Sequence, residues 1–206
     1  MRIAILGATG ATGREVLAAA LDRGHEVVAL ARRPEALSDV RHDRLDVKRA
    51  DVDEPSSVID AVRGADALIS ALGISKGGSS TTLSAGAKAV VAADVPRIAW
   101  MGTFGAGASR RRAGMLYDPI LRMVLHEGLR DKADAETLIA GPSTTIFHPA
   151  MLAAGPPTGR AHIVALDDLD RNFVFMPSKV ARTDVAATMV GEVEAPAYAG
   201  RTVAIL

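Results

Sequence analysis

The chain has 206 residues, 49% of them apolar, which is enough for one domain with a sizeable core and excludes intrinsic disorder. Its 24 basic side chains balance 24 acidic ones, so no general attraction to nucleic acid or to an anionic membrane is expected. There is no cysteine, and the five histidines lack the spacing of metal ligands, which excludes thiol catalysis and predicts no metal site. No stretch approaches the roughly 18 apolar residues of a membrane span, so we expect a soluble, cytoplasmic protein.

The first thirteen residues join a predicted strand to a predicted helix through a turn with glycine at every third position. Residues 3–6 are an apolar run with strand character, and apolar residues at helical spacing follow Arg14. Gly7 would allow a tight turn off the strand, and Gly13 would let the helix pack closely on it. Gly10 has no Cβ, so a pyrophosphate could approach the backbone there. This pattern predicts a dinucleotide-binding loop.

Two hydroxyl groups and the start of the helix support this interpretation. Thr9 and Thr12 add donors within the loop, and the free N–H groups of the first helical turn would face the phosphates. The alternative is a tight strand-to-helix turn that binds no ligand. Because the glycines follow a strand directly and a second cofactor position follows the next strand, we favour dinucleotide binding.

The second predicted strand, at 26–30, ends next to Arg32 and Arg33. In NAD-binding folds an acidic residue near this point holds the ribose 2′-hydroxyl, and none is present here. A carboxylate would repel a 2′-phosphate, whereas a guanidinium binds it with paired hydrogen bonds. The alternative is a solvated basic turn. We therefore expect NADP(H) to be preferred over NAD(H).

A third predicted strand, at 45–50, is followed by Asp51 and Val52. In a doubly wound sheet this strand end lies beside the adenine, where Asp51 would accept from the amino group and Val52 would lie against the ring. The alternative is that Asp51 or Asp53 begins the next helix as its cap. The sequence leaves these two interpretations open.

The remaining elements alternate between helices and strands. Helices are predicted at 55–63, 81–93, 118–140 and at a segment that ends at 193, with Thr183 or Asp184 as the cap of the last. Further strands are predicted at 66–71, 97–101, 144–147 and 202–205. We expect a single α/β domain over 1–206, with a doubly wound, mostly parallel Rossmann sheet flanked by helices. Residues 153–177 would form a small C-terminal region that covers the substrate, with short strands at 162–166 and 172–175.

Several of these segments together resemble a known group of proteins. GATGATG, the arginine after strand two, Asp51-Val52 and the Ala-Leu-Gly that ends at Gly73 resemble the atypical short-chain dehydrogenase/reductase superfamily. More narrowly, they resemble its NAD(P)H-binding group, which contains biliverdin reductase B and the NmrA-like proteins. Residues 131–136, His148-Pro149 and 182–186 agree with this resemblance.

The resemblance implies roles for individual residues. Those of the pyrophosphate and adenosine half are Gly7, Thr9, Gly10, Thr12, Gly13, Arg32, Arg33, Asp51 and Val52. Those of the inner ribose and the nicotinamide are Leu72, Gly73, Ile74 and Pro149. Thr103 and His148 are the catalytic candidates. Thr103 stands where related enzymes place a Ser or Thr near the nicotinamide, and His148 would lie along the nicotinamide ring with Pro149 and Ala150.

The sequence departs from the family's proton-transfer machinery. Many members use a Tyr-x-x-x-Lys pair, but Tyr117 is followed four residues later by Leu121. Met151 stands where biliverdin-reductase-like members carry a histidine, and Lys132 is expected on the surface of its helix. No dedicated proton donor is identified. Reduction of a flavin or quinone asks less of the protein in this respect, which favours such an acceptor over an alcohol.

We therefore expect an NADPH-dependent oxidoreductase that transfers hydride to a small aromatic acceptor such as a flavin or quinone. Thr103 would orient the nicotinamide or the substrate carbonyl by a hydrogen bond and would not act as a proton donor. One alternative is a non-catalytic NADP sensor of the NmrA type, and a less favoured one is a sugar-nucleotide epimerase or dehydratase. The expected partners are a small-molecule substrate and, at most, further copies of the chain in a small homo-oligomer.

Overall fold

The structure is a computed structural model that describes residues 1–73, 81–112, 128–159, 161–169 and 179–206, without the side chains of 110–112. Three sequence predictions lie outside the described residues: the role of Ile74, the strand at 172–175 and the first part of the helix at 118–140.

Among the described residues, eight strands form the main sheet in the order β3-β2-β1-β4-β5-β6-β10-β8. Every neighbouring pair is parallel apart from β8, which runs antiparallel to β10. The strands are β1 (Arg2–Leu6), β2 (Glu26–Ala31), β3 (Leu45–Arg49), β4 (Ala67–Ser70), β5 (Ile98–Met101), β6 (Thr144–Pro149), β8 (Ile163–Ala165) and β10 (Thr202–Ile205). The order reverses between β1 and β4, which is where doubly wound folds bind ligands.

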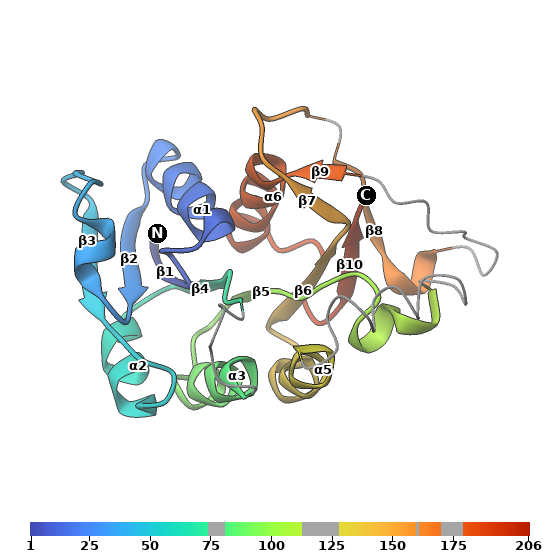
Figure 1. Ribbon diagram of the computed structural model, residues 1–206, viewed down its shortest axis with the longest axis horizontal. Helices are drawn as coiled ribbons and strands as arrows, with labels where there is room; N and C mark the ends of the chain where they lie inside the picture. The colour runs from blue at the N-terminus through green and yellow to red at the C-terminus, as the bar shows by residue number, and fades with distance from the viewer. Residues whose placement is uncertain (74–80, 113–127, 160, 170–178) are drawn as a thin grey trace.

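Helices cover both faces of the sheet. α1 (Ala11–Asp22) and α6 (Arg182–Glu194) lie side by side on one face, and α2 (Pro55–Val62), α3 (Thr82–Ala92) and α5 (Gly128–Ile139) lie on the other (Figure 1). None of the described helices is both long enough and apolar enough to cross a membrane. This arrangement confirms the predicted doubly wound Rossmann-type fold.

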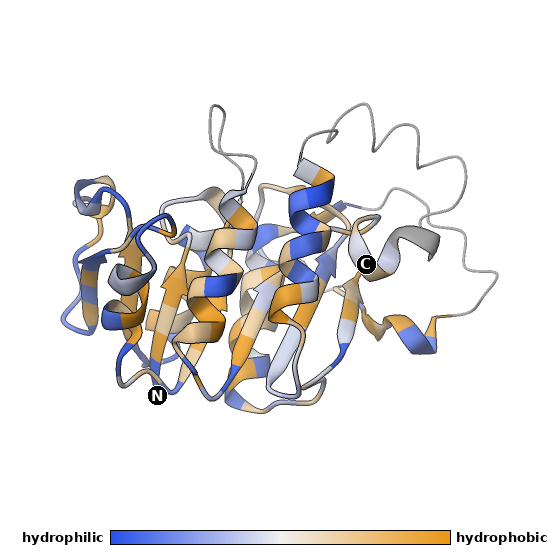
Figure 2. Cartoon of the chain, turned by 90° about the horizontal axis from the view of Figure 1, so that it is seen from below, coloured by the Kyte–Doolittle hydropathy of each residue, from blue (hydrophilic) through white to orange (hydrophobic). Residues whose placement is uncertain are grey.

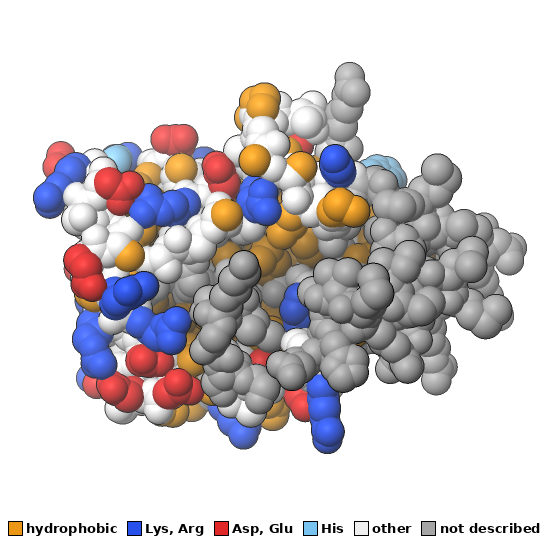
Figure 3. Space-filling model, in the orientation of Figure 1, with side chains coloured by type: hydrophobic (Ala, Val, Ile, Leu, Met, Phe, Trp, Pro, Cys, Tyr) orange, Lys and Arg blue, Asp and Glu red, His pale blue; other side chains and the backbone are white. Residues whose placement is uncertain are grey.

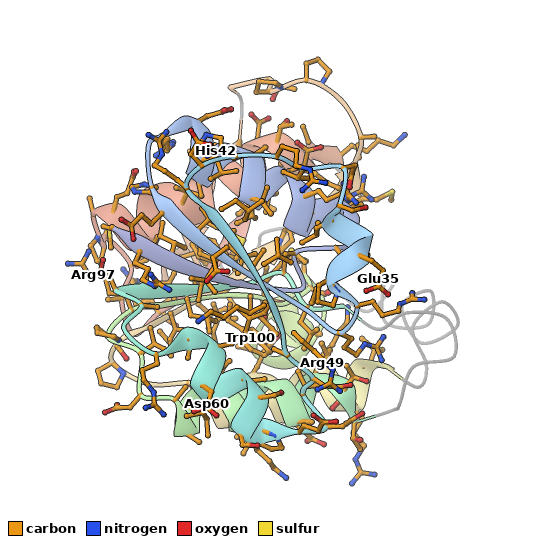
Figure 4. All side chains as sticks on the ribbon, turned by 90° about the vertical axis from the view of Figure 1, so that its left-hand side faces the viewer. Glu35, His42, Arg49, Asp60, Arg97 and Trp100 are labelled. Atoms are coloured by element: carbon orange, nitrogen blue, oxygen red, sulfur yellow. The ribbon has the colours of Figure 1, made fainter. Side chains whose placement is uncertain are left out.

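The alternation of side chains along the strands divides the core into two layers. Ile3 and Ile5 of β1 pack with α1 and α6, whereas Ala4 and Leu6 pack with the helices of the other face. Because both faces are covered, the central strands are apolar throughout, as Figure 2 shows by their hydropathy. Trp100 of β5 is buried in the second layer and lies in the interior of the molecule in Figure 4.

The predicted C-terminal covering region contributes to two sheets. β7 (Met151–Ala153) pairs with β9 (Lys179–Ala181) in a separate two-stranded parallel sheet. The strand predicted at 162–166 is present as β8, but it extends the main sheet beside β10. The described part of 153–177 therefore belongs partly to the sheet itself, followed by a short 3₁₀ turn, η3 (Leu166–Asp168). Two further 3₁₀ turns are η1 (Pro34–Leu37) and η2 (Gly107–Arg112).

The predicted helix caps differ from those of the structure. α6 begins after Ala181, so neither Thr183 nor Asp184 is its cap, and both side chains bind the loop at 155–159 instead. α2 begins after Glu54, so neither Asp51 nor Asp53 is its cap. Thr183 and Asp184 have their partners in a loop far away in the sequence, which local sequence could not show.

The start of α3 is stabilised from another helix. The carboxylate of Asp131, on α5, accepts the backbone N–H groups of Leu83 at 2.8 Å and Ser84 at 2.9 Å. It also accepts the hydroxyl of Ser84. Two of the free N–H groups at a helix start are satisfied in this way. The contact explains why an aspartate is buried between the two helices, and it fixes which face of α5 points inward.

Candidate active site

The three glycines of the N-terminal loop serve different structural purposes. Gly7 has a φ of +82°, and a Cβ there would lie 2.8 Å from backbone atoms of Ala71 and Leu72. A Cβ on Gly13 would lie 2.0 Å from the carbonyl oxygen of Gly7. Gly10 has an ordinary φ of −76°, and its Cβ would meet only the carbonyl oxygen of Gly7, at 3.4 Å. The fold thus requires Gly7 and Gly13, whereas Gly10 keeps space open at the start of α1.

A cavity of about 520 Å³ lies over this loop, at the carboxyl ends of β1, β2 and β4. The predicted cofactor-binding residues that line it are Gly7, Thr9, Gly10, Thr12, Arg32, Val52, Leu72 and Gly73. In the orientation of Figure 1, hydrophobic side chains gather in the middle of the molecular face, with Lys and Arg side chains around them (Figure 3). The cavity is therefore placed where the fold class binds dinucleotides.

Four of the described residues that were predicted to bind the cofactor do not line this cavity: Gly13, Arg33, Asp51 and Pro149. Gly13 is buried inside α1, and Arg33 is exposed next to Arg32. Asp51 is held in a local turn, because its carboxylate accepts the backbone N–H of Asp53 at 3.1 Å. Its backbone N–H donates to the Ser57 hydroxyl at 2.9 Å. Of the pair expected beside the adenine, the structure thus brings Val52 to the cavity but not Asp51.

A second cavity of about 250 Å³ lies next to the first. The two cavities share Leu72, Gly73, Met101 and Leu152. Apart from Thr103 and Lys132, the side chains that line the second cavity are apolar, and two of them, Pro149 and Ala150, come from the end of β6. Thr103 and Pro149 were predicted near the nicotinamide, and the structure places them together in this smaller space.

Thr103 and Lys132 form the polar pair of the second cavity. The ammonium of Lys132, on α5, donates to the Thr103 hydroxyl at 2.5 Å. Burial lowers the pKa of Lys132 because the ammonium loses water, and the nearby carboxylate of Glu136 only partly opposes that effect. A lysine in this state gives up a proton more readily than one in water.

Sequence reasoning placed Lys132 on the surface, and the structure corrects this. The Tyr-x-x-x-Lys pattern gives no signal for this residue, because Gly128 and not a tyrosine stands four residues before Lys132. In this chain the hydroxyl next to the lysine comes from Thr103, at the end of β5.

His148 lies behind the cavity and does not line it. Its ring is fully buried, with Nδ1 2.7 Å from the Ser109 hydroxyl and Nε2 2.9 Å from a carboxylate oxygen of Glu136. A Cβ on Gly102 would lie 2.4 Å from that carboxylate. The sequence predicted that His148 lies along the nicotinamide ring, but the structure places it behind the cavity. In that position the ring supports the loop that carries Thr103.

Of two arginines near the glycine loop, one is paired with a carboxylate and the other is not. Arg14, at the start of α1, donates to Asp39 at 2.7 Å and to the carbonyl of Ala36 at 2.6 Å. The hydrogen bond to Asp39 raises the pKa of Arg14 and lowers that of the carboxyl. Arg32 lines the cavity, and among the described residues it has no ion pair. Of these two residues, Arg32 is thus the one whose guanidinium is available for a phosphate.

These features fit a bound nicotinamide dinucleotide. The glycine loop leaves room for a pyrophosphate at Gly10, and Arg32 stands at the end of β2, where a ribose 2′-phosphate would lie. Val52 and Leu72 supply apolar parts of the cavity wall. The described residues contain no group of three or more His, Cys, Asp or Glu side chains that could hold a metal ion.

Known structures of the same architecture resemble this one over almost their whole length. A putative epimerase from Bacteroides thetaiotaomicron is 27% identical, with a TM-score of 0.78 over 99% of this chain and 95% of that one. An anaerobillin reductase from Escherichia coli O157:H7 is 22% identical, with a TM-score of 0.81 over 100% and 97%. A short-chain dehydrogenase/reductase from Veillonella parvula, in complex with NADP, is 16% identical, with a TM-score of 0.76 over 99% and 93%.

Fold and site together define a Rossmann-type dinucleotide-binding protein. A model of the family described as NAD(P)H-binding matches residues 7–196. The chain belongs to this family, and its resemblance to the atypical short-chain dehydrogenase/reductase group is confirmed.

Proposed function

We propose that the chain is an NADPH-dependent oxidoreductase that reduces a flat aromatic acceptor such as a flavin or a quinone. The observation that carries this proposal is that the two cavities are adjacent and share Leu72, Gly73, Met101 and Leu152 in their walls. A ligand that extends from the glycine loop would end next to the pair of Thr103 and Lys132. An acceptor in the second cavity would therefore meet the reactive end of the cofactor.

The preference for NADPH over NADH rests on Arg32. When bound, NADPH supplies the hydride, and the chain's own residues bind and orient it. Arg32 lines the cavity without an ion pair among the described residues, and no acidic side chain follows β2 before Glu35. A guanidinium at this place favours a 2′-phosphate and gives no acceptor for a ribose hydroxyl.

The acceptor side combines apolar walls with one proton source. Met101, Leu152 and Pro149 would contact the faces of an aromatic ring. Reduction by hydride also takes up one proton, and the Lys132 ammonium stands in contact with the Thr103 hydroxyl. We propose that Thr103 passes a proton from Lys132 to the acceptor while it orients the ring. The sequence predicted only an orienting role for Thr103, because it showed no neighbouring acid. The contact with Lys132 supports the additional role in proton transfer.

The test is NADPH oxidation by the purified chain against FMN, riboflavin, several quinones and biliverdin, with NADH run in parallel. The proposal expects turnover of at least one flavin or quinone and a higher kcat/KM with NADPH. Tight NADPH binding without turnover of any acceptor would favour the sensor of the NmrA type. Absence of NADPH binding would overturn the proposal. We expect a monomer or small homo-oligomer, which sedimentation measures.

A further inference from the structure

Arg182 occupies a position that the predicted cofactor residues do not include. It is the first residue of α6 and follows β9, whose pairing with β7 sets Leu152 beside Val180. Arg182 lines the larger cavity together with the glycine loop. It is partly buried there.

The two arginines of the larger cavity lie on opposite sides of the glycine loop. Arg32 follows β2, on one side of β1 in the sheet. Arg182 begins α6, which contacts β4 and β5, and it follows β9, the partner of β7. β4 and β5 lie on the other side of β1. Arg182 is therefore on the side of the smaller cavity, whose walls include Met101 and Leu152.

No described side chain neutralises Arg182. It forms no ion pair among the described residues. The nearest carboxylate in sequence, Asp184, accepts the N–H of Thr158 at 3.0 Å, its hydroxyl at 2.6 Å, and the N–H of Gly159 at 3.2 Å. Partial burial opposes ionisation of Asp184, but these hydrogen bonds outweigh it and lower its pKa. Asp184 is thus used to hold the loop.

The same loop is fixed at a second point, because the Thr183 hydroxyl donates to the carbonyl of Gly155 at 3.2 Å. The two side chains after Arg182 therefore bind the loop at 155–159, while Arg182 itself remains at the cavity wall. A partly buried cation without an acidic neighbour is costly unless an anion binds to it.

We propose that Arg182 binds an anionic oxygen in the nicotinamide half of the site, a phosphate or carboxylate oxygen on the bound ligands. This inference rests on the proposed function. The anionic group belongs either to the pyrophosphate of the dinucleotide or to the acceptor. Both present oxygens that a guanidinium binds with paired hydrogen bonds.

The test compares Arg182→Gln and Arg182→Lys with wild type in two measurements. The first is titration calorimetry with NADPH and with NADH, which share the pyrophosphate. The second is the KM for FMN and for riboflavin, which differ by one phosphate. Arg63→Gln is the matched control, because Arg63 pairs with Asp60 on the surface of the molecule, outside both cavities.

If Arg182 binds the pyrophosphate, Arg182→Gln weakens the binding of NADPH and of NADH by the same factor, about tenfold to a hundredfold. Arg182→Lys then retains part of the affinity for both. If it binds the acceptor, cofactor affinities stay unchanged and the KM for FMN rises while that for riboflavin does not. Unchanged values in both measurements, with a wild type that binds NADPH, overturn this inference alone. A wild type that binds no NADPH overturns the proposed function first.

Discussion

Lys132 and Thr103 are 29 residues apart in sequence, and the lysine donates to the threonine hydroxyl at 2.5 Å in the wall of the smaller cavity. The lysine comes from α5 and the threonine from the end of β5, so packing of the helix on the sheet creates the pair. The contact gives this partly buried lysine a hydroxyl partner from a different element of the fold. Its consequences can be measured in stability and in turnover.

The first prediction concerns the pH dependence of stability. Burial holds the pKa of Lys132 in the folded chain below its usual 10.5. Between the lowered pKa of Lys132 in the folded chain and its usual pKa in the unfolded chain, the unfolded chain binds more protons than the folded one. The lysine's contribution to the free energy of unfolding therefore rises with pH across that interval. Lys132→Met should therefore be more stable than wild type at pH 7, with an advantage that shrinks toward pH 10.5. Urea unfolding of both proteins over this range measures it. An advantage that grows with pH would contradict the direction of the shift.

The second prediction concerns turnover on a confirmed acceptor. If Thr103 and Lys132 act as one unit, Thr103→Val and Lys132→Met should each lower kcat by about tenfold to a hundredfold. The double variant should lose no more than the worse single one. Wild-type kcat should fall at alkaline pH as Lys132 loses its proton, and Lys132→Met should lack that limb. Thr137→Val, on the exposed side of α5, is the control and should keep full activity. Additive losses would show that the two side chains act separately.

Much of the fold could be predicted because its signals are local. β10 has the predicted bounds, and β2 and β3 each differ from the predicted strand by a single residue at the C-terminal end. The need for glycine at positions 7 and 13 follows from close contacts within the first strand, turn and helix and with the end of β4. Strand periodicity and turn chemistry depend on neighbours in sequence, so they can be read without coordinates.

The acceptor side could not be predicted in the same way. Asp131, Lys132 and Glu136 are charged, and hydropathy alone assigns charged residues to the surface of a helix. In the structure Asp131 and Glu136 are buried because each has a partner from another element, the start of α3 and His148. Lys132 lies between them on the same helix and is partly buried in contact with Thr103. Partners from distant parts of the chain decide this face, and a single sequence contains no signal for them.

The third prediction separates the two arginines after β2. Arg32→Ala should weaken the binding of NADPH by about tenfold to a hundredfold and leave the affinity for NADH nearly unchanged, because only NADPH carries the 2′-phosphate. Arg33→Ala is the matched control, since Arg33 is the neighbouring basic residue but does not line the cavity. Its effect on NADPH should be much smaller. Fluorescence titration with both cofactors measures the affinities. Equal affinity of wild type for NADH and NADPH would remove the basis for the cofactor preference.

The fourth prediction separates two glycines that look alike in sequence. Gly10 has an ordinary backbone conformation and open space before it, so Gly10→Val should fold normally but lose NADPH binding. Gly13 is in contact with the backbone of Gly7, and its Cβ would lie 2.0 Å from that oxygen. Gly13→Val should therefore fail to fold or melt far below wild type. Circular dichroism melting and NADPH titration distinguish the two. Normal NADPH affinity in Gly10→Val would place the pyrophosphate elsewhere.

The last prediction concerns His148, which the sequence favoured as a catalytic residue. Its ring is fully buried between Ser109 and Glu136 and does not reach either cavity. His148→Phe leaves the Glu136 carboxylate without this hydrogen bond, and loss of one partner from a buried pair costs about 3–5 kcal/mol in the free energy of unfolding. The variant should unfold at a much lower urea concentration. Any fraction that is folded should keep kcat within about tenfold of wild type, since no group at the cavity is removed.

A double variant separates this structural role from a catalytic one. If the cost of His148→Phe comes from the unpaired Glu136, then adding Glu136→Met should restore part of the stability, because replacement of both partners by apolar groups removes the buried charge. His42→Gln is the control, since His42 is an exposed histidine at the molecular surface (Figure 4). A catalytic His148 would give the opposite pattern: a normal urea midpoint and a kcat lowered beyond a thousandfold, with no recovery on adding Glu136→Met. The first pattern identifies His148 as a residue that stabilises the fold through its hydrogen bonds to Glu136 and Ser109.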